Sequence, residues 1–120
     1  MDASNTMLID PGELRSRFAG KADLLRRLTK IFSEQTPQLL ARLRHAVRRG
    51  DAPGVEWTAH TLKGSLAQLG ARATAELAQQ IESAARTSAP GRSETVIMEF
   101  ELHAAQIQRL LNELATSPEL

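Results

Sequence analysis

The sequence predicts an all-α protein, an antiparallel four-helix bundle with an additional short N-terminal helix. Three observations favour this class. Aromatic residues make up only 3% of the chain and tyrosine is absent, so the core is built mainly from leucine, isoleucine, valine and alanine, and strand-favouring residues are few. Apolar residues recur at steps of three and four over long segments. Short stretches rich in glycine and proline separate those segments.

The first expected helix covers about 10–18, because its opening Asp-Pro pair supplies a good cap and a good first-turn residue. Gly20 then breaks the pattern. A long helix follows over 21–49, with one apolar face. That face comprises Leu24, Leu28, Ile31 or Phe32, Leu39, Leu43 and Val47. Pro37 lies inside this helix and removes one backbone hydrogen bond, which predicts one bent helix, with two helices as the alternative.

The segment GDAPG at 50–54 separates the long helix from the next one. Gly50 can close the long helix in a left-handed conformation. Asp51 and Pro53 suit the cap and the first turn of a third helix. That helix is expected to run to about Leu69 and to stop at Gly70.

Two further helices complete the bundle. The fourth is expected over about 72–86, with inward residues Leu77, Ile81 and Ala84 or Ala85. The composition of 87–93 predicts a loop, and the fifth helix begins near Ser93 or Glu94. Its inward series is Val96 or Ile97, Phe100, Ala104, Ile107, Leu110 or Leu111, and Leu114.

Composition and charge limit the function classes. The chain has 120 residues, 42% of them hydrophobic, and a formal net charge of +1. This predicts one domain over residues 1–120, with a bundle core at about 21–115 and frayed ends at 1–9 and 116–120. Basic and acidic residues are interspersed, and no basic stripe with interleaved aromatics indicates nucleic-acid binding. The absence of cysteine excludes disulfides and thiolate chemistry.

No apolar run approaches the roughly 18 residues that span a bilayer. The opening MDASNTMLID also lacks the basic and apolar regions of a secretory signal. We therefore expect a cytoplasmic protein without membrane insertion, either free-standing or part of a larger chain.

The stretch AHTLKGSLAQLGA at 59–71 raises the question of function, because it groups a histidine, a lysine and a glycine. An α-helix turns about 100° per residue, so the apolar residues of the third helix gather within roughly 80° of arc. These are Val55, Ala59, Leu62, Leu66 and Leu69. His60 lies roughly 140° from the middle of this stripe. Its ring is therefore expected in solvent rather than in the core.

Lys63 and Gly64 are the surface neighbours of His60, because residues three and four apart are adjacent on a helix. Glycine inside a helix costs about 1 kcal/mol relative to alanine, and here it leaves the imidazole unobstructed. The lysine charge favours the neutral, nucleophilic ring and attracts an anion placed on it. Such a site suits receipt of a phosphoryl group, and a surface histidine with chance neighbours is the alternative. His45 and His103 lack convergent ligand spacing and are interpreted as ordinary surface residues, so no metal site is predicted.

The same stretch closely resembles the signature of histidine-containing phosphotransfer (HPt) domains of bacterial and eukaryotic phosphorelays. Their pattern is roughly A-H-x-L-K-G-S/G, followed by L-G-A. The phenylalanine in KIFSEQTPQLLARLRHAV, the GD pair before the histidine helix and QQIESAAR after it also match the usual layout. The resemblance covers most of the chain and implies a helical bundle that carries its histidine on an exposed helix face.

The resemblance also implies roles for individual residues. His60 would be the phosphoacceptor, Lys63 would assist electrostatically, and Gly64 would provide clearance. Gln68, two turns further on, would contact or position the incoming domain.

The helix after the histidine supplies two supporting residues under the same resemblance. Glu82 occupies a position where family members often have glutamine or glutamate, and it would bond the other ring nitrogen and fix the tautomer. Arg86 would contact the phosphoryl group or the partner. Docking is expected to use the N-terminal helix through Leu14 and Phe18, while Trp57 is either partly packed or a docking contact.

The implied function is a phosphorelay intermediate that accepts a phosphoryl group from a receiver-domain aspartate and passes it to another receiver aspartate. Its partners would be response-regulator receiver domains and a hybrid histidine kinase, and the required Mg²⁺ would belong to the receiver. The chain has no glycine-rich nucleotide loop and is expected to need no cofactor, so it would be a carrier rather than a kinase. A monomer is expected, because each helix uses its apolar face internally.

Three alternatives remain open. The chain could be a scaffold that binds a receiver without transferring phosphate, the phosphoacceptor domain of a chemotaxis-type kinase, or a structural bundle with a chance motif.

Overall fold

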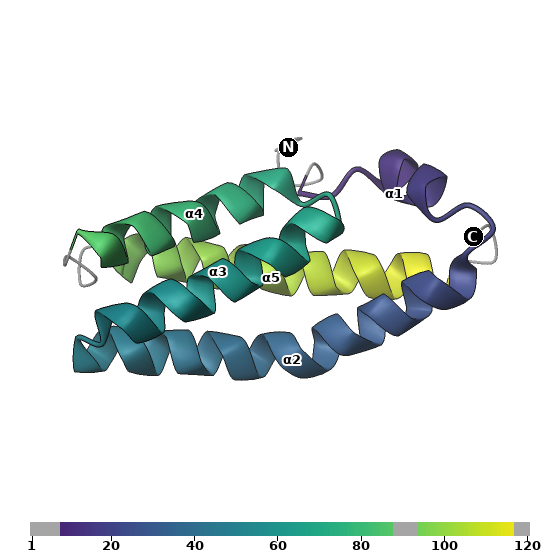
Figure 1. The fold of residues 1–120 in the computed structure, drawn as a ribbon. Helices are drawn as coiled ribbons and strands as arrows, with labels where there is room; N and C mark the ends of the chain where they lie inside the picture. The colour runs from purple at the N-terminus through teal and green to yellow at the C-terminus, as the bar shows by residue number, and fades with distance from the viewer. Residues whose placement is uncertain (1–7, 88–93, 117–120) are drawn as a thin grey trace.

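The computed structural model describes residues 8–87 and 94–116, and all of its regular structure there is helical. The helices are α1 (Pro11–Arg17), α2 (Ala22–Arg49), α3 (Ala52–Gln68), α4 (Arg72–Arg86) and α5 (Glu94–Ala115) (Figure 1). The predicted all-α class is confirmed, and each helix lies within about one residue of its expected bounds. Except for Thr87, the predicted loop at 87–93 lies outside the described residues.

The four long helices pack in a ring around one core. Helix α3 packs against α2 and α4, and α5 packs against the same two helices from the other side. The chain reverses direction between α2 and α3 and again between α3 and α4, as Figure 1 shows. The site on α3 is therefore flanked by α2 on one side and by α4 on the other.

Helix α2 continues through Pro37 without interruption, so the alternative of two separate helices is wrong. Its inward face also differs from the prediction in the first half. The buried line there passes through Leu25, Thr29, Phe32 and Thr36. Leu24, which the pattern had placed inward, is 40% exposed. Of the alternatives Ile31 and Phe32, Phe32 is the buried one and Ile31 is 40% exposed. The two buried threonines explain the error, because a count of apolar residues alone passes over them.

Two glycines end the long helices as predicted. Gly50 closes α2 with a φ of 69°, and Gly70 follows α3 with a φ of 76°. Both values lie in the left-handed region that residues with a Cβ atom rarely adopt. Asp51 then caps α3 by accepting a hydrogen bond of 3.1 Å from the backbone N–H of Gly54. These turns fix where α3 begins and ends, and so fix the position of His60.

Helix α1 closes one end of the bundle over the α3–α4 turn. The guanidinium of Arg17 donates to the carbonyl oxygen of Gln68 over 2.6 Å. Leu14 and Phe18 are buried in the core. The prediction that these two residues contribute to docking is therefore wrong, because their apolar side chains cover the end of the bundle instead.

The residues just before α1 are also packed. Leu8 and Ile9 are buried members of the core cluster. The expectation of a frayed N-terminus is wrong for these two positions, because burial of their apolar side chains holds the segment against the bundle. Residues 1–7 lie outside the described part of the chain.

In α3 and α5 the residues predicted to face inward are buried, and in α4 some of them are. The α3 stripe is buried throughout, and so is the α5 series at Ile97, Phe100, Ala104, Ile107, Leu111 and Leu114. On α4, Ile81 and Ala85 are buried, whereas Leu77 and Ala84 are only partly buried. None of the helices in the described ranges is both long enough and apolar enough to pass through a membrane.

Candidate functional site

His60 stands on the outer face of α3, beside α4. Its neighbours Ala59 and Leu62 point into the core, and the helical turn places the intervening imidazole outside. The side chain of His60 is 66% exposed. The predicted orientation is therefore confirmed, and the ring is open to a visiting molecule.

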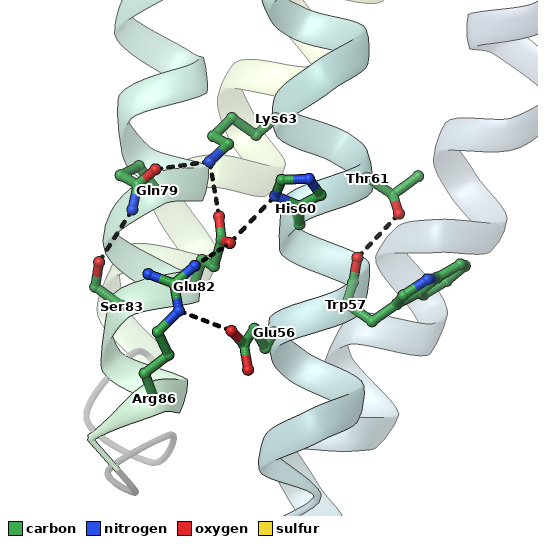
Figure 2. Close-up of polar contacts among 9 residues, drawn as sticks. All are labelled: Glu56, Trp57, His60, Thr61, Lys63, Gln79, Glu82, Ser83 and Arg86. Atoms are coloured by element: carbon green, nitrogen blue, oxygen red, sulfur yellow. Dashed lines mark hydrogen bonds and ion pairs between the residues drawn. The ribbon is translucent and has the colours of Figure 1, made fainter.

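One nitrogen of the ring is anchored by a carboxylate from α4. His60 Nδ1 lies 3.2 Å from Glu82 Oε2, and the Glu82 side chain is only 2% exposed (Figure 2). An ionised carboxylate can only accept a hydrogen bond, so the proton of the neutral ring resides on Nδ1. The lone pair is then on Nε2, the nitrogen that Glu82 does not contact.

Two cations hold Glu82 in its ionised form. Lys63 Nζ lies 2.9 Å from Glu82 Oε1, and Arg86 Nη2 lies 2.7 Å from Glu82 Oε2. Burial pushes the pKa of Glu82 upward, but the Lys63 hydrogen bond and the charges of Lys63, His60 and Arg86 outweigh it. The pKa of Glu82 is therefore lowered, and the carboxylate is charged at neutral pH.

The ammonium of Lys63 is directed at α4 rather than at the ring alone. Besides its contact with Glu82, Nζ donates to Gln79 Oε1 over 2.7 Å. Gln79 in turn donates to the hydroxyl of Ser83 over 3.1 Å. The predicted positive charge of Lys63 is present next to His60 on α3, but it is paired with the buried carboxylate of Glu82. The sequence pattern of α3 could not show this, because the partners belong to α4.

Arg86 links α4 to the first turns of α3. Its Nε donates to Glu56 Oε2 over 2.7 Å, while Nη2 reaches Glu82. The hydrogen bond to Glu56 and the charge of Glu82 raise the pKa of Arg86. Sequence analysis placed Arg86 near the site but did not predict its contact with Glu56. The only available signal was its position one turn before His60 on the same helix.

These residues line a shallow depression on the surface. Its lining comprises Pro53, Glu56, Trp57, His60, Glu82 and Arg86. Two carboxylates and one guanidinium thus stand beside the exposed ring. Because the two carboxylates repel an anion, an anionic group can bind in the depression only if the cationic side chains stay close to that group.

Gly64 leaves open space next to the ring. A Cβ atom at this position would have no heavy atom within 4 Å. The open space therefore lies on the outer surface of the bundle. Packing within the chain does not require a glycine at this position. Gln68 is exposed two turns along α3, and its side chain takes no part in the described hydrogen bonds around His60.

The sequence left open whether Trp57 is partly packed or a docking contact. The residue is 56% exposed, so it is not mainly a packing residue. It lies in a groove between α2 and α3 that is lined by Gln35, Gln38, Leu39, Arg42, Trp57 and Thr61. An exposed indole one turn from His60 is a suitable contact for a partner.

The other two histidines differ from His60. His45 is exposed on α2, as expected. His103 on α5 is only 22% exposed in its side chain, which corrects its interpretation as an ordinary surface residue. Its Nδ1 lies 3.3 Å from the hydroxyl of buried Thr74. Within residues 8–87 and 94–116, no cluster of His, Cys, Asp and Glu side chains could hold a metal ion.

Comparison with family models matches this chain to the Hpt domain over residues 27–117, which is more than half of its length. The match includes α3 to α5 and therefore every residue of the network around His60. No curated protein and no solved structure matches the chain.

Proposed function

Because the chain belongs to the Hpt domain family, whose members carry out histidine phosphotransfer in two-component phosphorelays, we propose that His60 is its phosphoacceptor. The observation that carries this proposal is the ring's asymmetry. Nδ1 is held by buried Glu82, while the ring is otherwise open to solvent. A phosphoryl donor can therefore approach Nε2 without displacing any side chain of the bundle.

The transfer step follows from this geometry. The Nε2 lone pair attacks the phosphorus of an aspartyl phosphate in line, and the P–O bond to the aspartate breaks. The N–P bond forms, the donor aspartate leaves as a carboxylate, and the proton stays on Nδ1. The ring is then cationic, and the Glu82 carboxylate at 3.2 Å stabilises that charge. The same steps in reverse pass the group to a second receiver.

The neighbouring residues support this step in different ways. Lys63 keeps Glu82 ionised through its contact of 2.9 Å. Its ammonium also attracts the negative phosphoryl oxygens, because Lys63 is a surface neighbour of His60 on α3. Gly64 lets the donor surface come close to the ring, since no side chain occupies that space. Both roles serve positioning and charge neutralisation, which dominate phosphoryl transfer.

The docking surface that we propose extends from His60 over the α2–α3 groove. Trp57 and Ile31 are its exposed apolar residues, and Gln68 lies at its far end beside Ile31. Apolar centres with polar rims are typical of protein interfaces. A receiver domain placed here would contact α2 and α3 and would leave α1 uncovered.

In this proposal the chain is a phosphate carrier in the cytoplasm and not a kinase. Its partners are receiver domains and a hybrid histidine kinase, and the Mg²⁺ needed for transfer is held by the receiver's acidic pocket. A scaffold without transfer is the weaker alternative, because the network that anchors Nδ1 has no evident use in simple binding.

The test is transfer from a phosphorylated receiver domain to the purified chain. We expect an acid-labile label on the wild-type chain, because phosphohistidine hydrolyses in acid, and no label on His60→Gln with unchanged helical content. A wild-type chain that binds the receiver but never gains label would favour the scaffold alternative. Label that persists in His60→Gln would contradict the assignment of the phosphoacceptor.

A further inference from the structure

Arg86 is shared between two carboxylates that differ in their surroundings. Its Nη2 lies 2.7 Å from Glu82 Oε2, and its Nε lies 2.7 Å from Glu56 Oε2. The side chain of Glu82 is 2% exposed, whereas that of Glu56 is 40% exposed. Figure 2 shows the guanidinium reaching from α4 toward α3, with Glu56 beside it and His60 beyond Glu82.

The charges around the ring are balanced before phosphorylation. Glu56 and Lys63 come from α3, and Glu82 and Arg86 come from α4, which gives two negative and two positive groups. A phosphoryl group adds a negative charge of about 1.5 to 2, and the positive charge of the phosphorylated ring offsets only part of it. The nearby cations are therefore insufficient for all three anions, and the anions compete for them.

Glu56 is the anion that can give way. Its carboxylate is partly in water, so it can turn outward and recover its hydration. Glu82 cannot do so, because it is buried and is held by Lys63 as well as by Arg86. A guanidinium that leaves Glu56 keeps its bond to Glu82, and its freed Nε donor remains in the depression that His60 also lines.

We propose that Glu56 competes with the phosphoryl group on His60 for Arg86 and so limits the stability of the phosphohistidine. This inference rests on the proposed function of His60 and adds a regulatory residue to that site. Because Glu56 binds Arg86, it weakens the interaction of Arg86 with the phosphoryl group. The phosphoryl group can then still be passed on to a receiver. Glu56 is thus a positioning residue that acts through Arg86.

The test uses phosphoramidate as a small donor, so that no receiver is needed. Ammonia leaves as the P–N bond of the donor breaks, and the N–P bond to His60 forms. The pKa of the phosphoryl group is then followed by ³¹P NMR in wild type and in Glu56→Gln. We expect the titration midpoint to fall by about half a unit in Glu56→Gln, a roughly threefold loss of proton affinity. The phosphohistidine half-life at neutral pH is expected to rise in parallel.

Arg86→Gln separates competition from simple charge repulsion. In that background, Glu56→Gln is expected to move the midpoint by less than half as much. Glu76→Gln on α4 removes the same charge from an exposed side chain outside the network, and it is expected to leave the midpoint unchanged. Circular dichroism confirms that each variant is folded, and half-exposed Arg86 can be replaced without opening the core.

The outcomes distinguish the inference from the function on which it rests. Equal midpoints in wild type and Glu56→Gln would overturn the role of Glu56, even if His60 is labelled normally. An undiminished shift in the Arg86→Gln background would overturn the competition for Arg86. A folded wild-type chain that takes no label on His60 would contradict the proposed function itself, and this inference with it.

Discussion

His60 on α3 and His103 on α5 both contact residues of α4, and they differ in how their ring nitrogens are used. The His60 ring is 66% exposed, with Nδ1 3.2 Å from a buried carboxylate. The His103 ring is 22% exposed, with Nδ1 3.3 Å from the Thr74 hydroxyl and Nε2 3.8 Å from Glu99. One ring keeps a nitrogen free for chemistry, whereas the other has a neighbour at each nitrogen.

The comparison separates two uses of the same side chain. At His103 the imidazole satisfies a hydroxyl that is fully buried, and its partner Glu99 is itself in solvent. At His60 the burial is reversed, because the carboxylate is inside and the ring is outside. A buried charge that is kept ionised by Lys63 and Arg86 can orient a ring firmly and can stabilise it when it becomes cationic.

The largest expected effect comes from removing each histidine in turn. His60→Gln is expected to abolish phosphorylation by phosphoramidate. His103→Gln is expected to keep it but to lower the free energy of unfolding by about 1 kcal/mol, because Thr74 loses its partner. Label transfer and urea denaturation measure the two effects. Loss of label in folded His103→Gln would erase the distinction between the two sites.

The two acidic partners provide the next contrast. Glu82→Gln keeps an oxygen that can accept from Nδ1, but it removes the charge that stabilises the cationic ring. We expect phosphorylation to slow by roughly 10- to 100-fold, as for other hydrogen bonds to charged groups. Glu99→Gln is the matched control at His103 and is expected to leave the rate unchanged. Equal rates in wild type and Glu82→Gln would show that the carboxylate is not needed.

Acid unfolding provides a third test, which concerns the charge of Glu82. Because the pKa of Glu82 is lowered in the fold, its charge stabilises the fold above the unfolded glutamate pKa of about 4.3. This stabilisation is lost as the pH falls through the lowered pKa of the folded state. The stability advantage of wild type over Glu82→Gln is therefore expected to shrink below about pH 4.3. An advantage that grows on acidification would mean that the pKa is raised instead.

The smallest expected effect concerns Gly64. Gly64→Ala is expected to raise the free energy of unfolding by about 1 kcal/mol, because alanine is the better helix former and its Cβ meets no neighbour. Transfer from a receiver is expected to slow only moderately, whereas Gly64→Gln slows it further by filling the gap. Thermal unfolding and receiver-to-chain transfer rates measure the two effects. An unchanged transfer rate in Gly64→Gln would contradict the need for clearance.

The sequence predicted the parts of the site that depend on a single helix. The 100° turn of α3 placed Val55 and Leu62 inside and His60 outside, and the structure agrees. The position of Gly64 next to His60 was predictable in the same way, since residues four apart are neighbours on a helix surface. Helix bounds were also predictable, because Gly50 and Gly70 mark the ends by their backbone conformation.

The parts that depend on contacts between helices were harder to predict. The contact of Glu82 with the ring was expected only through the family resemblance, and the link between Arg86 and Glu56 was missed. Neither contact follows from periodicity, because the register of α4 against α3 is set by packing. Leu14 and Phe18 were misplaced for the same reason, since only the tertiary structure shows what an apolar helix face covers.

The most direct measurement is ¹⁵N NMR of the chain with labelled histidine, before and after phosphorylation by phosphoramidate. Nitrogen shifts and couplings to phosphorus show which ring and which nitrogen carry the group. The structure leads us to expect Nδ1–H on resting His60 and phosphorus on Nε2 of the same ring. Phosphorus on Nδ1, or on a histidine other than His60, would contradict the assignment of an anchored Nδ1 and a free Nε2.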